Sequence, residues 1–253
     1  MRIFFLLLYS TVASAQPFSH AHAHNDYEHD HPLFDALQNG FTSVEADIYL
    51  VDGKLLVSHT QPIFTARTLD QLYLSPLDSI IKANHGKVYP GYEGPFYLMI
   101  DIKSDGQATY PVLKEAIAQY PTLFHSPAEA GPVIIFLSGN CPKEAVLKDL
   151  AAPVALDGRP GDIGKGYTPE VMPVISDTYG KWSSWNGKDS PGPEALQRIK
   201  DLAQRVHAEG KKLRLWAIPD NPYAWQELLE AGVDFINTDK LKELNQFLKS
   251  VKN

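Results

Sequence analysis

The chain has very little cysteine: Cys141 is the single cysteine among 253 residues. One cysteine cannot form an intramolecular disulfide, so the fold must be stabilised by packing rather than by cross-links. We expect this lone thiol to be a small buried apolar group and not a nucleophile.

Positive charge is also scarce. Lys and Arg number 23 against 30 Asp and Glu, which gives a formal net charge of −7. A general nucleic-acid-binding protein needs Lys and Arg to neutralise phosphates, so this balance argues against a nucleic-acid partner. The sequence also has no basic run that could hold an anionic membrane surface.

Long apolar runs are missing after the N-terminus, so we expect no stable membrane insertion. At the N-terminus, Arg2 precedes an apolar run over 3–9 and the small residues Ala13-Ser14-Ala15. This order is typical of a cleaved secretory signal peptide, and the run is too short to be a membrane anchor. The sequence predicts a signal peptide over residues 1–15 and one soluble domain over 16–253. We expect a secreted or periplasmic monomer.

Short apolar runs alternate with helix-period segments along the chain. The expected strands are 18–24, 42–48, 96–102, 133–137, 154–156, 171–175, 212–218 and 233–237. The expected helices are 32–38, 69–83, 110–120, 143–150, 193–209 and 222–230. Alternating strands and helices in one domain predict an α/β fold, a single (β/α)₈ TIM barrel. An open doubly wound sheet is the alternative, but no glycine-rich phosphate loop follows the first strand.

Two of the expected strands carry charged side chains among apolar ones. Strand side chains alternate between faces, so Glu45 and Asp47 share a face, as do Asp101 and Lys103. Burying such charges is costly unless something pairs with them. A cation held by Glu45, Asp47 and Asp101 would offset that cost.

Polar residues recur where the expected strands end. They are His24, Asp47, Asp101, 138–140, 157–159, Asp177, Trp216 and 238–239. A TIM barrel carries its functional groups at the C-terminal ends of its strands. The repeated coincidence therefore indicates an active-site rim.

The order of these motifs resembles the PLC-like phosphodiesterase superfamily. That group includes phosphatidylinositol phospholipases C, glycerophosphodiester phosphodiesterases and sphingomyelinase D toxins. His24-Asn25-Asp26-Tyr27 is similar to the His-Asn element of the eukaryotic phospholipases C, and Asp101-x-Lys103 is similar to an element of sphingomyelinase D. The strongest resemblance is to the branch named after altered inheritance of mitochondria protein 6. It is carried by His24–Tyr27, Ser43–Asp47, Arg67–Leu69, Leu72–Leu74 and Asn237–Asp239, and it covers 18–244.

The resemblance implies a metal-dependent phosphoric diester hydrolase that acts on a glycerophosphodiester or a phospholipid-type substrate. His24 and His59 are the expected general acid–base pair. The expected ligands of one divalent cation, Ca²⁺ or Mg²⁺, are Asn25, Glu45, Asp47 and Asp101, since oxygen ligands select hard cations. The residues expected to contact the substrate are Lys103, His22, Arg159 and Trp216.

Two other functions stay open. A pair such as His22-x-His24 at the end of a first strand also opens zinc amidohydrolases and related phosphoesterases. Those sites need further histidines, and the fifth and sixth expected strands contain none. A catalytically inactive binding barrel is the other alternative, but every expected catalytic position is filled.

The leaving group of the substrate also stays open. The His-Arg-Gly opening and the Pro-Glu-Asn-Thr segment of the glycerophosphodiesterases are absent from the sequence. Glycerophosphodiesters, lysophospholipids and phosphoinositides are all compatible with the remaining motifs.

Overall fold

The computed structural model describes residues 15–62, 66–126, 129–188 and 191–251. The predicted signal peptide therefore lies outside the described residues, apart from Ala15. Among the described residues, no helix has both the length and the apolar character needed to cross a membrane.

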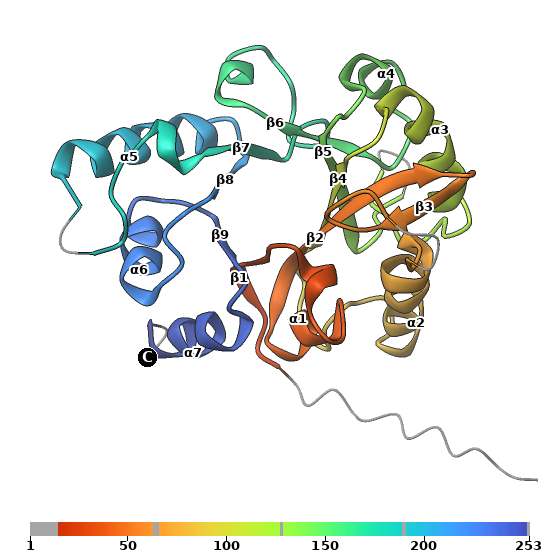
Figure 1. Ribbon diagram of the computed structural model, residues 1–253, viewed down its shortest axis with the longest axis horizontal. Helices are drawn as coiled ribbons and strands as arrows, with labels where there is room; N and C mark the ends of the chain where they lie inside the picture. Colours follow the sequence, from red (N-terminus) through yellow and green to blue (C-terminus); the bar gives the residue numbers. More distant parts are fainter. Residues whose placement is uncertain (1–14, 63–65, 127–128, 189–190, 252–253) are drawn as a thin grey trace, which may run out of the picture.

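Parallel strands close into a barrel, and one further strand is attached to it as a hairpin (Figure 1). The barrel strands are β1 (Phe18–Ala23), β2 (Phe41–Val51), β4 (Phe96–Ile102), β5 (Val133–Gly139), β6 (Ala155–Gly158), β7 (Val174–Thr178), β8 (Lys212–Trp216) and β9 (Phe235–Thr238). The ring closes because β1 pairs in parallel with both β2 and β9. The additional strand, β3 (Lys54–Val57), pairs antiparallel with β2. The predicted TIM barrel is confirmed, and the open sheet is excluded.

Helices surround the ring of strands (Figure 1). They are α1 (Phe34–Gln38), α2 (Ser75–Ala83) with the π-helical turn η2 (Asp70–Leu74) before it, α3 (Gly106–Ile117), α4 (Lys143–Lys148), α5 (Pro193–His207), α6 (Pro222–Glu230) and α7 (Leu241–Val251). The 3₁₀ turns are η1 (Asp26–Glu28), η3 (Pro160–Asp162) and η4 (Tyr179–Lys181). The segment from β6 to β7 thus carries a 3₁₀ turn where the other connections carry an α-helix.

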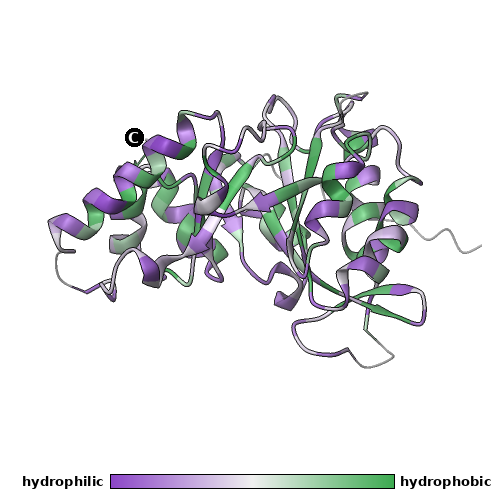
Figure 2. Ribbon diagram, turned by 90° about the horizontal axis from the view of Figure 1, so that it is seen from above, coloured by the Kyte–Doolittle hydropathy of each residue, from purple (hydrophilic) through white to green (hydrophobic). Residues whose placement is uncertain are grey.

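Helix α5 shows why these segments are helical. The stripe Ile199, Leu202, Ala203 and Val206 recurs at helical spacing and is buried. At the start of α6, the side chain of Asn221 accepts a hydrogen bond from the amide of Ala224 at 3.1 Å. Figure 2 shows the same division at large scale, with hydrophobic residues along the strands and hydrophilic ones on the outer helix faces.

Several predicted boundaries and elements were wrong. Strand β7 begins at Val174 and not at Val171, because the Val171 amide bonds Thr168 in a turn and Pro173 has no N–H to offer a strand. Strand β8 ends at Trp216, because Ala217 adopts a left-handed backbone with φ 55°. Neither strand β3 nor helix α7 was predicted.

The barrel interior is largely apolar toward the N-terminal ends of the strands. The buried cluster inside it comprises Tyr97, Met99, Phe136, Ala155, Val174 and Phe235. The ring centroids of Tyr97 and Phe235 are 5.1 Å apart in an edge contact, and His22 lies above Phe235 with centroids 6.0 Å apart. This apolar cluster fills the barrel on the N-terminal side of the polar residues. The polar side chains therefore face the C-terminal end of the barrel.

Candidate active site

Three carboxylates lie together at the C-terminal end of the barrel. The parallel register of β2 and β4 sets Asp47 beside Asp101, and Glu45 lies on the same face of β2 as Asp47. One oxygen of each of the three lies within 4.8 Å of the other two. Asp47 is fully buried, and Glu45 is 5% exposed. The structure thus brings together the carboxylates that strand alternation places on one face.

Each aspartate of this group has one engaged oxygen and one unpaired oxygen. Oδ2 of Asp47 lies 2.8 Å from the Tyr27 hydroxyl and 3.1 Å from the Lys103 ammonium. Oδ2 of Asp101 lies 3.2 Å from the same ammonium. Oδ1 of Asp47 and Oδ1 of Asp101 are buried without a hydrogen-bond partner among the described residues. Unpaired buried carboxylate oxygens are costly, and a hard divalent cation is the ligand that would satisfy them.

Burial and neighbouring charge shift the pKa of each carboxyl group. Burial raises the pKa of Asp47, and the negative charge of Glu45 raises it further. Burial also raises the pKa of Asp101, although Lys103 acts in the opposite direction. For Glu45, burial acts upward, but Arg214 and His22 outweigh it and lower the pKa to about 2. The site therefore holds a firmly ionised Glu45 beside two aspartates whose ionised forms a cation would stabilise.

Arg214 is a buried partner of Glu45 that the sequence analysis did not identify. It is 3% exposed, and its Nη2 lies 3.0 Å from Oε2 of Glu45. Its Nε donates to Oδ1 of Asn237 at 2.9 Å. The available signal was the alternation in β8, which puts Lys212, Arg214 and Trp216 on one face.

His22 is buried beneath this ion pair. Its Nδ1 lies 2.7 Å from Oγ of Ser43, and its Nε2 is 3.5 Å from Oε2 of Glu45. Burial lowers the pKa of His22 to about 4, and the nearby Arg214 contributes. His22 is therefore neutral near pH 7, and its side chain is fully buried inside the barrel. Within the described chain, the group of potential metal ligands contains carboxylates and no histidine, which gives no support to the zinc alternative.

His24 forms a pair with Asp239, the carboxylate that directly follows the last barrel strand. Its Nδ1 lies 2.8 Å from Oδ1 of Asp239, and its side chain is 32% exposed. Burial lowers the pKa of His24, but Asp239 and Glu45 more than reverse this effect, so the pKa is raised. The Nε2 atom is left for other partners.

His59 reaches the site from the hairpin and not from a barrel strand. Strand β3 turns back along β2, with Val57 beside Ile48, and this return brings His59 over Asp47. Nδ1 of His59 lies 3.3 Å from Oδ2 of Asp47 and 3.2 Å from the Tyr27 hydroxyl. The side chain is 56% exposed, so Nε2 can face a substrate.

Asn25 follows β1 at the edge of the carboxylate group. It adopts a left-handed backbone with φ 46°, which asparagine tolerates better than most residues. Its Oδ1 lies 2.9 Å from the Tyr27 hydroxyl, which also contacts Asp47. The predicted fourth ligand is therefore linked to the group through Tyr27.

Arg159 and Trp216 lie at other strand ends around the barrel opening. Nη1 of Arg159 bonds Oδ2 of Asp157 at 2.8 Å, and its Nη2 bonds Oγ of Ser138 at 3.2 Å. Asp157 also accepts from Ser176, so the carboxylate anchors a second polar network. Trp216 is 41% exposed at the end of β8. The contacts of Arg159 are thus with this second network.

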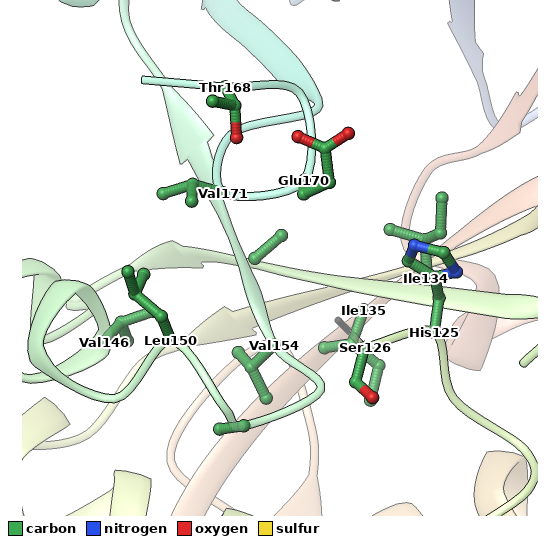
Figure 3. A pocket seen from close by; sticks show the side chains of 12 residues that line it. His125, Ser126, Ile134, Ile135, Val146, Leu150, Val154, Thr168, Glu170 and Val171 are labelled. Carbon is green, nitrogen blue, oxygen red and sulfur yellow. The ribbon is translucent and has the colours of Figure 1, made fainter. Parts of the chain in front are cut away.

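A cavity of about 270 Å³ lies at the opposite end of the barrel (Figure 3). Its lining includes His125 and Val154, which precede β5 and β6, and Val171, which precedes β7. Most of its lining is aliphatic, with Thr168 and Glu170 among the polar exceptions. It is separate from the carboxylate group.

Comparison with known families identifies the fold and the class of reaction. The profile of the AIM6-like phosphodiesterase domain matches residues 10–152, more than half of the chain. The chain belongs to this family. A second profile, that of the glycerophosphoryl diester phosphodiesterase family, matches residues 212–242, which include β8 and β9. Phosphodiester hydrolysis is therefore its general class of reaction.

Individual relatives agree with the family assignment. An altered inheritance of mitochondria protein 6 homolog from Arthroderma benhamiae is 28% identical over 86% of this chain and 80% of its own length. Altered inheritance of mitochondria protein 6 from Lachancea thermotolerans is 29% identical over 88% of this chain, which spans 64% of that relative. A solved glycerophosphodiester phosphodiesterase from Parabacteroides distasonis superposes with a TM-score of 0.57 at 13% identity, covering 94% of this chain and all of that one. At that identity the superposition supports the fold alone.

Proposed function

We propose that the chain hydrolyses phosphodiesters of the glycerophosphodiester or phospholipid type with one divalent cation and two histidines. The observation that carries the proposal is a pair of histidine–carboxylate contacts beside the carboxylate group. His24 contacts Asp239, and His59 contacts Asp47, in each case through Nδ1. The Nε2 atom of each ring is thereby left for the substrate and its leaving group.

The residues that would hold the cation, Ca²⁺ or Mg²⁺, are Asn25, Glu45, Asp47 and Asp101. A bound cation would neutralise phosphoryl charge and stabilise the additional negative charge of the transition state. The charges of the site agree with one divalent ion: Arg214 and Lys103 offset two of the three carboxylates that they contact. One dication would then leave a positive site for a monoanionic phosphodiester.

The two imidazoles would transfer the protons of the reaction. A neutral ring accepts the proton of the attacking hydroxyl at Nε2, and the other ring, protonated, donates to the leaving alkoxide. Asp239 and Asp47 stabilise the imidazolium forms that arise in this exchange. Attack by water would give a phosphomonoester, whereas attack by a substrate hydroxyl would give a cyclic phosphate.

Lys103 would contribute a fixed positive charge beside the phosphate. Burial lowers the pKa of Lys103, but Asp101 and Asp47 more than compensate, so the pKa is raised and the ammonium stays charged. Such a point charge can contact a phosphoryl oxygen without directional constraint. Arg159 and Trp216 would contact parts of the substrate that lie farther from the phosphorus.

A panel of phosphodiesters followed by ³¹P NMR tests this function. The panel includes glycerophosphocholine, lysophosphatidylcholine and phosphatidylinositol, each with Ca²⁺ or Mg²⁺ present. We expect a monoester or cyclic phosphate signal with the wild-type protein and its loss in His24→Ala. The surface variant His31→Ala serves as the control that keeps activity. If the wild-type protein produces neither signal with any phosphodiester, the proposal is wrong.

A further inference from the structure

Tyr27 is a residue of the site to which the motif His24–Tyr27 gave no role of its own. It lies in turn η1, two residues after Asn25, and its side chain is half-buried. Its hydroxyl oxygen lies 2.8 Å from Oδ2 of Asp47, 2.9 Å from Oδ1 of Asn25 and 3.2 Å from Nδ1 of His59. One hydroxyl therefore connects three parts of the chain: Asn25 after β1, Asp47 within β2 and His59 after β3.

The number of available protons fixes the direction of these contacts. A tyrosine hydroxyl carries one proton at neutral pH and can donate only one hydrogen bond, whereas three groups lie within reach of the Tyr27 oxygen. The carboxylate of Asp47 is a stronger acceptor than the amide oxygen of Asn25, so the proton points to Asp47. The Tyr27 oxygen can then accept a hydrogen bond from Nδ1–H of His59.

The same contacts determine which nitrogen of His59 carries the proton. Both groups within reach of its Nδ1, the Tyr27 oxygen and Oδ2 of Asp47, are acceptors. A neutral His59 must then be protonated at Nδ1, which leaves an unprotonated Nε2 toward the substrate. The two contacts are 3.2 Å to the Tyr27 oxygen and 3.3 Å to Oδ2 of Asp47, so both acceptors favour a proton on Nδ1.

We propose that Tyr27 is a positioning residue that holds His59 in its Nδ1–H tautomer over Asp47. The inference rests on the proposed function for its catalytic meaning, but the tautomer exists whether or not the chain is active. The hydroxyl joins the loop that carries His59 to a buried carboxylate of the barrel. Without it, the contact with Asp47 alone would hold the exposed ring of His59, and the Nδ1–H tautomer would be less favoured.

Tyr27→Phe removes the hydroxyl and keeps the ring. Long-range ¹H–¹⁵N NMR at about pH 8.5, where imidazoles are neutral, reports which nitrogen of each histidine is protonated. The His59 signals are assigned by their loss in His59→Gln. We expect Nδ1–H in the wild-type protein and a shift toward Nε2–H in Tyr27→Phe. The matched control is Tyr120→Phe, which removes a hydroxyl bonded to the carboxylate of Asp70.

Turnover gives the second measurement. Loss of a hydrogen bond to a charged group predicts a fall in kcat of about tenfold in Tyr27→Phe, with the control unchanged. An unaltered His59 tautomer in Tyr27→Phe would overturn the inference, whatever happens to activity. A wild-type protein without phosphodiesterase activity would instead overturn the proposed function, and the tautomer measurement would still decide the role of Tyr27.

Discussion

Gly139 offers a sharp perturbation of the carboxylate group from outside it. This glycine ends β5 beside Ile102 of β4 and has a left-handed backbone with φ 65°. A Cβ at this position would overlap Oδ1 of Asp101, which is one of the two unpaired buried oxygens of the carboxylate group. Gly139→Ala therefore displaces an oxygen that the proposed cation would need as a ligand.

Gly139→Ala should lower both the stability of the fold and its affinity for the cation. A left-handed backbone costs a non-glycine residue about 1–2 kcal/mol of stability. The added Cβ would also lie 2.6 Å from the carbonyl oxygen of Ile102, where real Cβ atoms stay beyond 3.0 Å. Asp101 must therefore move, and metal-ligand distances tolerate only about 0.2 Å. We expect cation affinity to fall by about tenfold or more, which corresponds to about 1.4 kcal/mol.

Calorimetric titration of Ca²⁺ and Mg²⁺, with thermal unfolding in parallel, measures both effects. Gly86→Ala is the matched control, because Gly86 also has a positive φ, 93°, but no atom lies within 4 Å of the added Cβ. Both variants should lose stability, and only Gly139→Ala should lose cation binding. Wild-type cation affinity in Gly139→Ala would refute the placement of the cation at Oδ1 of Asp101.

Four further outcomes are expected. His24→Ala and His59→Ala should each lower turnover by about 10²–10⁴, the double variant by less than the product, and His22→Ala by less than either; steady-state kinetics checks this order. Arg214→Met should destabilise the fold by about 3–5 kcal/mol in urea unfolding, because Glu45 keeps a buried unpaired charge, and adding Glu45→Gln should recover part of the loss. Burial raises the pKa of Asp26 to about 7, above its ordinary 3.8. The protonated form thus stabilises the fold fully below pH 3.8, and this contribution is lost as the pH rises through 7, so Tm should fall more steeply over that range in the wild-type protein than in Asp26→Asn. Mass spectrometry of protein from its native host should find residues 1–15 removed, and an intact Met1 would contradict that prediction.

Local patterns predicted the barrel and the carboxylate group well. Strand alternation is a local property, so Glu45 and Asp47 could be assigned to one face from the sequence of β2 alone. Their meeting with Asp101 followed from the rule that parallel strands end at the same edge of a barrel.

The partners of those residues could not be predicted in the same way. Arg214 and Glu45 are 169 residues apart in the chain, and His24 and Asp239 are 215 apart. Such pairs depend on which strands become neighbours when the barrel closes. The hairpin strand β3 is a different case, because the turn Asp52-Gly53 between two apolar runs is a local hairpin signal that should have predicted it.

Rates of phosphodiester hydrolysis after metal removal show whether the carboxylate group works through a divalent cation. The protein is treated with EDTA, dialysed and assayed with Ca²⁺, Mg²⁺ or Zn²⁺ added back, alongside Asp47→Asn and the control variant Asp35→Asn, whose half-buried carboxylate contacts His31 and not the carboxylate group. We predict that activity disappears with EDTA, returns with Ca²⁺ or Mg²⁺ in the wild-type protein and in Asp35→Asn, and does not return in Asp47→Asn. Full activity after EDTA would contradict the need for a cation. Restoration by Zn²⁺ alone, with two zinc ions per chain, would contradict a single Ca²⁺ or Mg²⁺ at the carboxylate group.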